Sequence, residues 1–178
     1  GGPKLGLWGH GRNFQANLQS RPGEALKGFM SKRVDWWFAY NDMSQQIVER
    51  LGVPSPRITN VQNAIDTRRL HAAYRATAPA QQARLRRTLG LRGRNVGLFV
   101  GSMYAEKRID FLVAACRRVR AAVPDFEMLW IGAGPDADRV RAACRAHEWM
   151  RYVGARRGLD RVPYFALAKV LLMPGLVG

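Results

Sequence analysis

Short apolar runs alternate along the chain with segments in which apolar residues recur every three or four positions. Short runs rich in β-branched and aromatic residues predict strands, whereas the longer spacing predicts amphipathic helices. Seven runs predict strands, at residues 5–8, 34–40, 58–61, 95–100, 126–131, 150–153 and 170–173. Because strands that alternate with helices build βαβ units, we expect an α/β fold with parallel sheets.

The segments between these runs predict helices, at about residues 26–33, 44–51, 81–89, 105–122 and 135–148. The first of them places Leu26, Phe29 and Met30 on one face, with basic residues around them. Asp42 or Ser44 is expected to cap the second, because a side-chain oxygen at that point accepts from the backbone N–H groups of a first helical turn.

Two lobes are expected. Residues 67–94 are rich in arginine and contain no strand-like run, which indicates a linker and helix between residues 1–66 and residues 95–178. Each lobe is then a Rossmann-like unit, and both units are incomplete. Ligands of such sheets bind at the carboxyl ends of the strands, so we expect a cleft between the lobes at those ends.

Composition narrows the class of partner. The 178 residues are 47% apolar, enough to bury a core, and the formal net charge of +16 favours an anionic partner. Nucleoside diphosphates, acidic membrane surfaces and nucleic acid all carry the required charge.

Cys116 and Cys144 lie in separate helical segments, which indicates free thiols in a reducing, cytoplasmic compartment. No apolar run is long enough to span a bilayer, no leader is recognisable, and the chain starts at Gly1 as a piece of a longer protein would.

The segment from residue 95 to residue 113 has the order of a phosphate site. A strand-like run ends at Gly101, and Lys107 and Arg108 stand just before a helix-like segment. Backbone N–H groups at a helix N-terminus attract anions, and a lysine in the preceding loop adds a full positive charge. The alternative is that both cations are solvated residues of an ordinary βα loop.

Glycines surround another candidate residue at the end of the first predicted strand. His10 lies between Gly9 and Gly11, so the backbone there permits close approach of a ligand. A histidine in a structural turn is the alternative.

The run that follows the fifth predicted strand contains two glycines. Gly132 and Gly134 formally match the dinucleotide fingerprint G-x-G-x-x-A, but no acid that would bind a ribose closes the following strand. Asp136 and Asp138 follow in the spacing of a metal site, yet acids are common at helix N-termini for electrostatic reasons. We therefore predict neither a tightly bound cofactor nor a metal site.

Five segments taken together resemble a known family. They are Trp8–Gly11, Val34–Asn41, Ile58–Asp66, Val100–Leu112 and Trp130–Pro135. In this order they are similar to retaining GT-B glycosyltransferases of the family 4 or "group 1" type, and residues 152–154 and 164–174 continue the similarity. The fold class implied is α/β, with two Rossmann-like lobes of which the chain holds incomplete parts.

The resemblance implies a role for particular residues. Gly101 and Lys107 would lie on the donor diphosphate, and His10 would reach toward the transferred sugar. Ser102 stands where family members often have arginine, so Arg108 or another arginine would have to supply the missing charge. The remaining implied donor contacts are Gly132, Gly134, Tyr152, Val153 and Gly154, of which the last three would lie near the nucleotide base.

The function implied is transfer of a sugar, with retention, from a UDP- or GDP-sugar to an alcohol on a sugar or lipid-linked acceptor. Such an enzyme is expected to be bacterial, to build cell-envelope polysaccharide, and to work in the cytoplasm or at the inner face of the cytoplasmic membrane. The fragment alone is expected to be weakly active or inactive. Two alternatives stay open, a basic nucleic-acid-binding module and a dinucleotide-dependent oxidoreductase.

Overall fold

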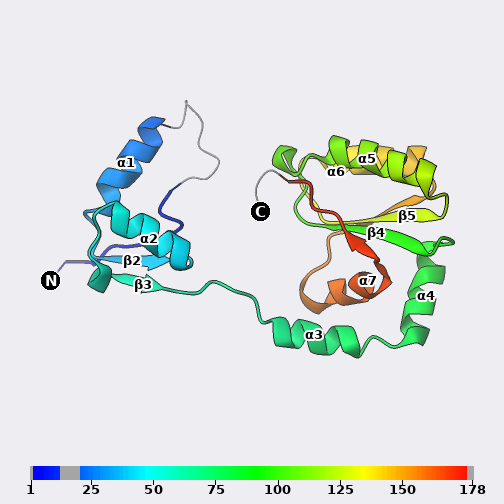
Figure 1. The fold of residues 1–178 in the computed structure, drawn as a ribbon, viewed down its shortest axis with the longest axis horizontal. Coiled ribbons are helices and arrows are strands. Elements are labelled where there is room, and N and C mark those ends of the chain that lie inside the picture. Colours follow the sequence, from blue (N-terminus) through cyan, green and yellow to red (C-terminus); the bar gives the residue numbers. More distant parts are fainter. Residues whose placement is uncertain (1, 13–20, 176–178) are drawn as a thin grey trace. The chain divides into compact units, whose positions relative to one another are not determined.

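The computed structural model describes residues 2–12 and 21–175, and the chain divides into two compact units (Figure 1). The first unit is Gly1–Ile65 and the second is Asp66–Gly178. Each unit has a parallel sheet and apolar clusters of its own. The predicted α/β class with parallel sheets is therefore confirmed.

The first unit contains a three-stranded parallel sheet in the order β1-β2-β3. The strands are β1 (Gly6–Gly9), β2 (Trp36–Ala39) and β3 (Ile58–Asn60), and the helices are α1 (Arg21–Ser31) and α2 (Asp42–Arg50). Val34, Trp37, Val48 and Val53 form its buried core. Because side chains alternate along a strand, the neighbours of Trp37 on β2 point to the other face, where Trp36 and Phe38 are each 40% exposed.

The second unit contains a four-stranded parallel sheet in the order β6-β5-β4-β7. Its strands are β4 (Asn95–Val100), β5 (Phe126–Ile131), β6 (Met150–Gly154) and β7 (Val170–Leu171). Its helices are α3 (Thr67–Arg75), α4 (Pro79–Leu89), α5 (Ile109–Ala122), α6 (Ala137–Ala146) and α7 (Val162–Leu167). In Figure 1, α5 and α6 lie over one face of this sheet and α7 lies on the other.

Alternation along the two central strands explains why both faces of the second sheet are covered. Phe99, Met128 and Trp130 face the cluster that α5 and α6 complete. Leu98 and Leu129 belong to the cluster on the other side, with α7. All five side chains are fully buried, as expected for the centre of a parallel sheet with helices on both faces.

All seven predicted strands are present, and none of their ends differs by more than two residues. The helices match less completely, because α3 and α7 were not predicted. Helix α3 has no fully buried residue, and its apolar face is limited to a few residues around Leu70 and Ala73, which is too short a pattern to predict a helix. Helix α7 is only six residues long, too short to show a period. The structure groups α3 and α4 with the second unit, and both helices contact α7.

Two local predictions were wrong. The cap of α2 is Asn41, whose side-chain oxygen accepts from the Ser44 N–H at 3.0 Å, because the helix begins two residues earlier than its apolar pattern suggests. Helix α5 begins at Ile109 rather than near residue 105. A separate 3-10 turn, Ala105–Lys107, precedes it, and Arg108 with φ of 52° breaks the continuity between them.

Helix α1 also differs from a buried amphipathic helix. Its apolar residues Leu26, Phe29 and Met30 are between 40% and 62% exposed. Among the residues that the structure describes, no helix is both long enough and apolar enough to cross a bilayer.

Candidate functional site

Three loops meet at the carboxyl edge of the second sheet. The β4 loop (residues 101–108), the β5 loop (residues 132–136) and the β6 loop (residues 155–161) each follow one of three neighbouring strands. In the strand register Val100 pairs with Ile131, and Ile131 pairs with Gly154, so the three loops start at the same level. This is the edge where open α/β sheets bind their ligands.

Backbone hydrogen bonds connect the β4 and β5 loops. The Gly101 N–H donates to the Ile131 carbonyl at 3.0 Å, and the Met103 N–H donates to the Ala133 carbonyl at 2.9 Å. The Asp136 N–H donates to the Met103 carbonyl at 3.0 Å, in the opposite direction between the two loops. The β4 and β5 loops are thus joined to each other through main-chain hydrogen bonds.

The two glycines of the β5 loop are required by this close approach. Gly132 and Gly134 have φ values of 149° and 151°, a region that L side chains rarely adopt. A Cβ on Gly132 would overlap the carbonyl oxygen of Gly101, and one on Gly134 would overlap that of Met103. The G-x-G pattern is therefore explained by packing of one loop on the next.

The β6 strand holds the β5 loop from the other side. The Gly132 N–H donates to the Gly154 carbonyl at 3.1 Å, and the Tyr152 hydroxyl donates to the Gly132 carbonyl at 2.9 Å. Val153 points away and packs, half-buried, against the apolar cluster that contains α7. Tyr152 and Gly154 thus both form hydrogen bonds with Gly132, and Val153 packs into the apolar core.

A cavity of about 300 Å³ opens at this edge, and we name it the arginine hollow. The β4 and β5 loops contribute Gly101, Ser102, Gly132 and Ala133, and the β6 loop contributes Arg156, Arg157 and Arg161. Among the described residues, none of those that line the arginine hollow is acidic. Three guanidinium groups without a carboxylate make it a site for an anion.

Lys107 and Arg108 lie further along the β4 loop and do not line the hollow. Lys107 is only 7% exposed, and its Nζ lies 5.5 Å from the centre of the Tyr104 ring. The guanidinium of Arg108 is stacked 4.2 Å from the centre of the Phe111 ring, on the exposed side of α5. Lys107 is therefore a buried cation beside the carboxyl edge, whereas Arg108 is a surface residue.

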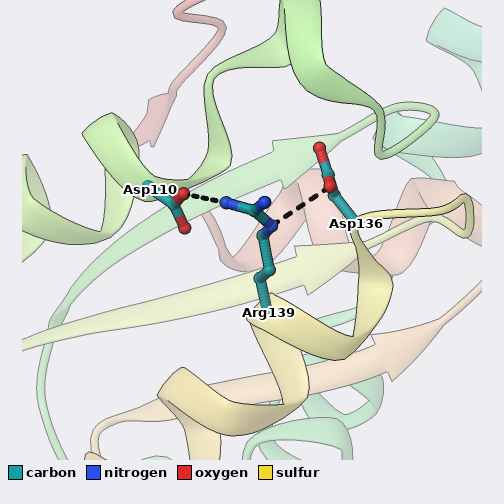
Figure 2. A network of polar contacts seen from close by, with 3 residues as sticks. All are labelled: Asp110, Asp136 and Arg139. Carbon is teal, nitrogen blue, oxygen red and sulfur yellow. Dashed lines mark hydrogen bonds and ion pairs between the residues drawn. The ribbon is translucent and has the colours of Figure 1, made fainter.

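Acidic side chains occupy the first turns of α5 and α6. Figure 2 shows Arg139 between Asp110, in the first turn of α5, and Asp136, which directly precedes α6. Asp138 is in turn paired with Arg141 at 2.6 Å. Carboxylates at these positions already balance the positive ends of both helices, so an anion at this edge needs positive side chains.

His10 belongs to the first unit, where it follows β1. Its Nδ1 lies 3.0 Å from the Ser44 hydroxyl, and its ring is 4.2 Å from that of Tyr40. The same hydroxyl donates to the Asn41 side-chain oxygen at 3.0 Å, so it accepts from His10 Nδ1–H. The contacts with Ser44 and Tyr40 fix the plane of the ring.

Of the residues singled out from the sequence, Gly101, Ser102 and Gly132 line the arginine hollow, and Gly134, Tyr152 and Gly154 hold the loops that form it. Arg156, Arg157 and Arg161 were missed. A signal was present, because Arg156 and Arg157 come within four residues of the end of the strand predicted at residues 150–153. Among the described residues, no group of three or more His, Cys, Asp or Glu side chains is placed to hold a metal ion.

Comparison with known proteins gives one family match. Residues 94–177 match the family described as "Glycosyl transferases group 1". The match covers β4 to β7 and all three loops of the carboxyl edge. No curated protein sequence matches the chain.

Solved structures with the same fold include three named proteins. HepE from Anabaena, solved with UDP and glucose, has a TM-score of 0.68 and 16% identity over 94% of this chain and 45% of its own. WaaG, a glycosyltransferase involved in lipopolysaccharide biosynthesis, has a TM-score of 0.62 and 16% identity over 92% of this chain and 46% of its own. TarM from S. aureus has a TM-score of 0.58 and 13% identity over 91% of this chain and 29% of its own. At these identities the likeness shows the fold, and the chain spans less than half the length of each.

Proposed function

We propose, from the membership of residues 94–177 in the group 1 glycosyl transferases, that the protein to which this chain belongs transfers a sugar from a nucleoside diphosphate donor. The family resemblance read from the sequence and the fold of two incomplete Rossmann-like GT-B lobes are both confirmed. The donor, the stereochemistry, the acceptor and the site residues that follow are part of the proposal.

The observation that carries this proposal is the cationic character of the carboxyl edge. Sugar transfer needs positive charge on the departing diphosphate while an oxocarbenium-like centre forms, and preorganised charge lowers that barrier most effectively in a site that excludes water. Lys107, buried in the β4 loop, and the arginines of the hollow offer such charge at the ends of β4 and β6. Gly101 and Ser102 line the same hollow, as a donor site on this edge requires.

For the donor we favour a UDP-sugar, because HepE was solved with UDP and with UDP-glucose. A GDP-sugar is the alternative within the same chemistry. Transfer occurs with retention to an alcohol of a sugar or lipid-linked acceptor. His10, with Nδ1 bonded to Ser44, is proposed to act at the transferred sugar through its other ring nitrogen.

We propose that the enzyme acts at the inner face of the cytoplasmic membrane of a bacterium, in the synthesis of cell-envelope polysaccharide. Helix α1 supports the membrane part of this proposal, because Leu26 and Phe29 are 62% and 51% exposed beside Lys27 and Arg33. Exposed apolar residues flanked by cations are typical of helices that bind anionic lipid surfaces.

The proposed function is tested by nucleotide binding to the 178-residue chain. In Lys107→Met the stem is retained and the charge removed, so we expect the affinity for UDP to fall at least about tenfold, since a charge-assisted contact to phosphate is lost. Isothermal titration with UDP, GDP and NAD measures this. Lys169→Met, an exposed lysine before β7, is the matched control.

Two outcomes would contradict the proposal. Unchanged UDP affinity in Lys107→Met would show that the buried lysine does not bind the donor. Binding of NAD or of generic DNA in place of any nucleoside diphosphate would favour the oxidoreductase or the nucleic-acid-binding module.

A further inference from the structure

A second cavity, of about 390 Å³, lies at the opposite edge of the second sheet from the arginine hollow. Residues that precede β4, β5 and β6 line it, and we name it the amino-edge cavity. Its charged lining residues are Arg92, Arg120, Arg151, Asp125, Glu127 and Glu148. We propose that the amino-edge cavity binds a neutral sugar unit of a glycan.

Glu127 is the buried polar group of this cavity. It is only 4% exposed, and both of its carboxylate oxygens accept from the single backbone N–H of Arg92, each at 3.1 Å. Within residues 2–12 and 21–175, the ion pairs join arginines to other acids, and none reaches Glu127. A carboxylate accepts up to about four hydrogen bonds, so Glu127 keeps acceptor capacity toward the cavity, where a ligand that donates to it offsets the cost of its burial.

The other charged side chains divide into two groups. Arg120 and Arg151 donate to main-chain carbonyl oxygens, at 2.6 Å and 2.9 Å, and so hold the backbone around the cavity. The side chains of Arg92 and Glu148 form no hydrogen bond or ion pair with any residue in the described part of the chain. Arg92 and Glu148 therefore offer a ligand one group that donates and one that accepts, besides the acceptor Glu127.

The balance of charge indicates a neutral ligand. Three guanidinium groups and three carboxylates line the amino-edge cavity, whereas the arginine hollow has cations without acids among its described lining residues. An anion is therefore attracted to the hollow and not to this cavity. Every hydroxyl of a sugar both donates and accepts, so one sugar ring can bond to Glu127 and Arg92 together, and bonds to charged groups are the stronger kind.

An aromatic ring completes the site. Trp149, which is half-buried, also lines the amino-edge cavity, and its indole gives an apolar surface for the C–H face of a sugar ring. The volume of about 390 Å³ falls within the range of small-molecule sites, roughly 300–1,000 Å³. Because the cavity lies at the other edge of the sheet, it would hold a glycan outside the proposed site of transfer, which takes the inference beyond the proposed function.

The test titrates the 178-residue chain with the methyl α-glycosides of glucose, galactose, mannose and N-acetylglucosamine, and follows the indole N–H signal of Trp149 by NMR. Glu127→Gln keeps an acceptor for the Arg92 N–H, and Arg92→Met changes an exposed side chain that lines the cavity. Arg94→Met, exposed but outside the lining, is the matched control. We expect each cavity variant to bind the glycosides at least about tenfold more weakly, because a hydrogen bond to a charged group is lost, and the control to bind them like the unaltered chain.

Several results would overturn the inference. They are the absence of binding by all four glycosides, binding that Arg92→Met leaves unchanged, and binding of the free sugars without the glycosides. Binding of glycine betaine or sulfate in place of the glycosides would identify a zwitterion or an anion site and would also overturn it. If Glu127→Gln fails to unfold cooperatively, Arg92→Met against Arg94→Met decides.

A UDP titration separates this inference from the proposed function. Arg92→Met should bind UDP like the unaltered chain, because its side chain lies at the other edge of the sheet. If the glycosides bind in the amino-edge cavity and neither UDP nor GDP binds, the inference stands and the proposed function fails. If UDP binds and the glycosides do not, the inference is overturned and the proposed function stands.

Discussion

Two cysteines illustrate how burial sets the chemistry of single residues in this protein. Cys116 lies on the buried face of α5, and burial raises the pKa of its thiol to about 12. Burial likewise raises the pKa of the Cys144 thiol to about 11, although the positive charge of Arg151 opposes this shift. Since the thiolate is the reactive form, both thiols are protected while the protein is folded.

We predict that iodoacetamide modifies both cysteines slowly at pH 8 in the folded protein. A pKa raised from 9.0 to about 11 lowers the thiolate fraction about a hundredfold, so Cys144 reacts far more slowly than in the unfolded chain and Cys116 more slowly still. Mass spectrometry of timed samples measures the order. Equal rates in folded and urea-unfolded protein would contradict the prediction.

The β5 loop shows how an element depends on its neighbour. Its two glycines lie against the carbonyl oxygens of the β4 loop, whereas Gly101 has Phe99 ring atoms no closer than 3.5 Å to the position of a Cβ. Gly132 therefore tolerates a methyl group poorly, whereas Gly101 has room for one. Because both glycines line the arginine hollow, alanine substitutions at the two positions form a matched pair of variants.

We predict that Gly132→Ala lowers the free energy of unfolding by about 3 kcal/mol or more, because the methyl group overlaps the Gly101 carbonyl in a strained backbone region. Gly101→Ala should change that free energy by less than about 1 kcal/mol. Urea unfolding followed by circular dichroism compares the two variants. Similar midpoints would show that the β4 and β5 loops separate easily.

Helix α1 gives a second prediction for a single element. The unaltered chain should sediment with vesicles that contain anionic lipid and remain in solution with neutral ones, because both apolar contacts and positive charge are needed. Leu26→Ser/Phe29→Ser should abolish sedimentation. A matched double change of exposed residues in the second unit, Phe111→Ser/Val119→Ser, should leave it unchanged. Sedimentation of both variants alike would contradict a role for α1.

On the level of the whole molecule, the two units have separate cores. The cluster around Trp37 belongs to the first unit, and the two clusters on either face of the β4 to β7 sheet belong to the second. We predict that residues 66–178 fold without the first unit, because α3 and α4 contact α7 within the same unit. Thermal unfolding of this segment should be cooperative. A segment without a cooperative transition would contradict an independent second unit.

The strands and most helices follow from local pattern. Val96, Leu98 and Phe99 form a run that only a buried strand explains, and Leu112 and Cys116 repeat at the helical spacing. Helix α3 was missed because none of its residues is fully buried and only Leu70 and Ala73 are half-buried, so its apolar face toward α7 is narrow. The pattern of the chain reports burial, and an element with little burial leaves little pattern.

The residue order alone established the α/β class, the seven strands, the glycine-rich carboxyl edge and the family resemblance, because each of these depends on residues close together in the chain. The fold decided the rest. The order β6-β5-β4-β7 brings the loops after three strands to one edge, where Arg156 and Arg157 line the same cavity of about 300 Å³ as Gly101 and Ser102. Such a cavity depends on which strand ends are neighbours, and that is a property of long-range pairing that no local spacing encodes.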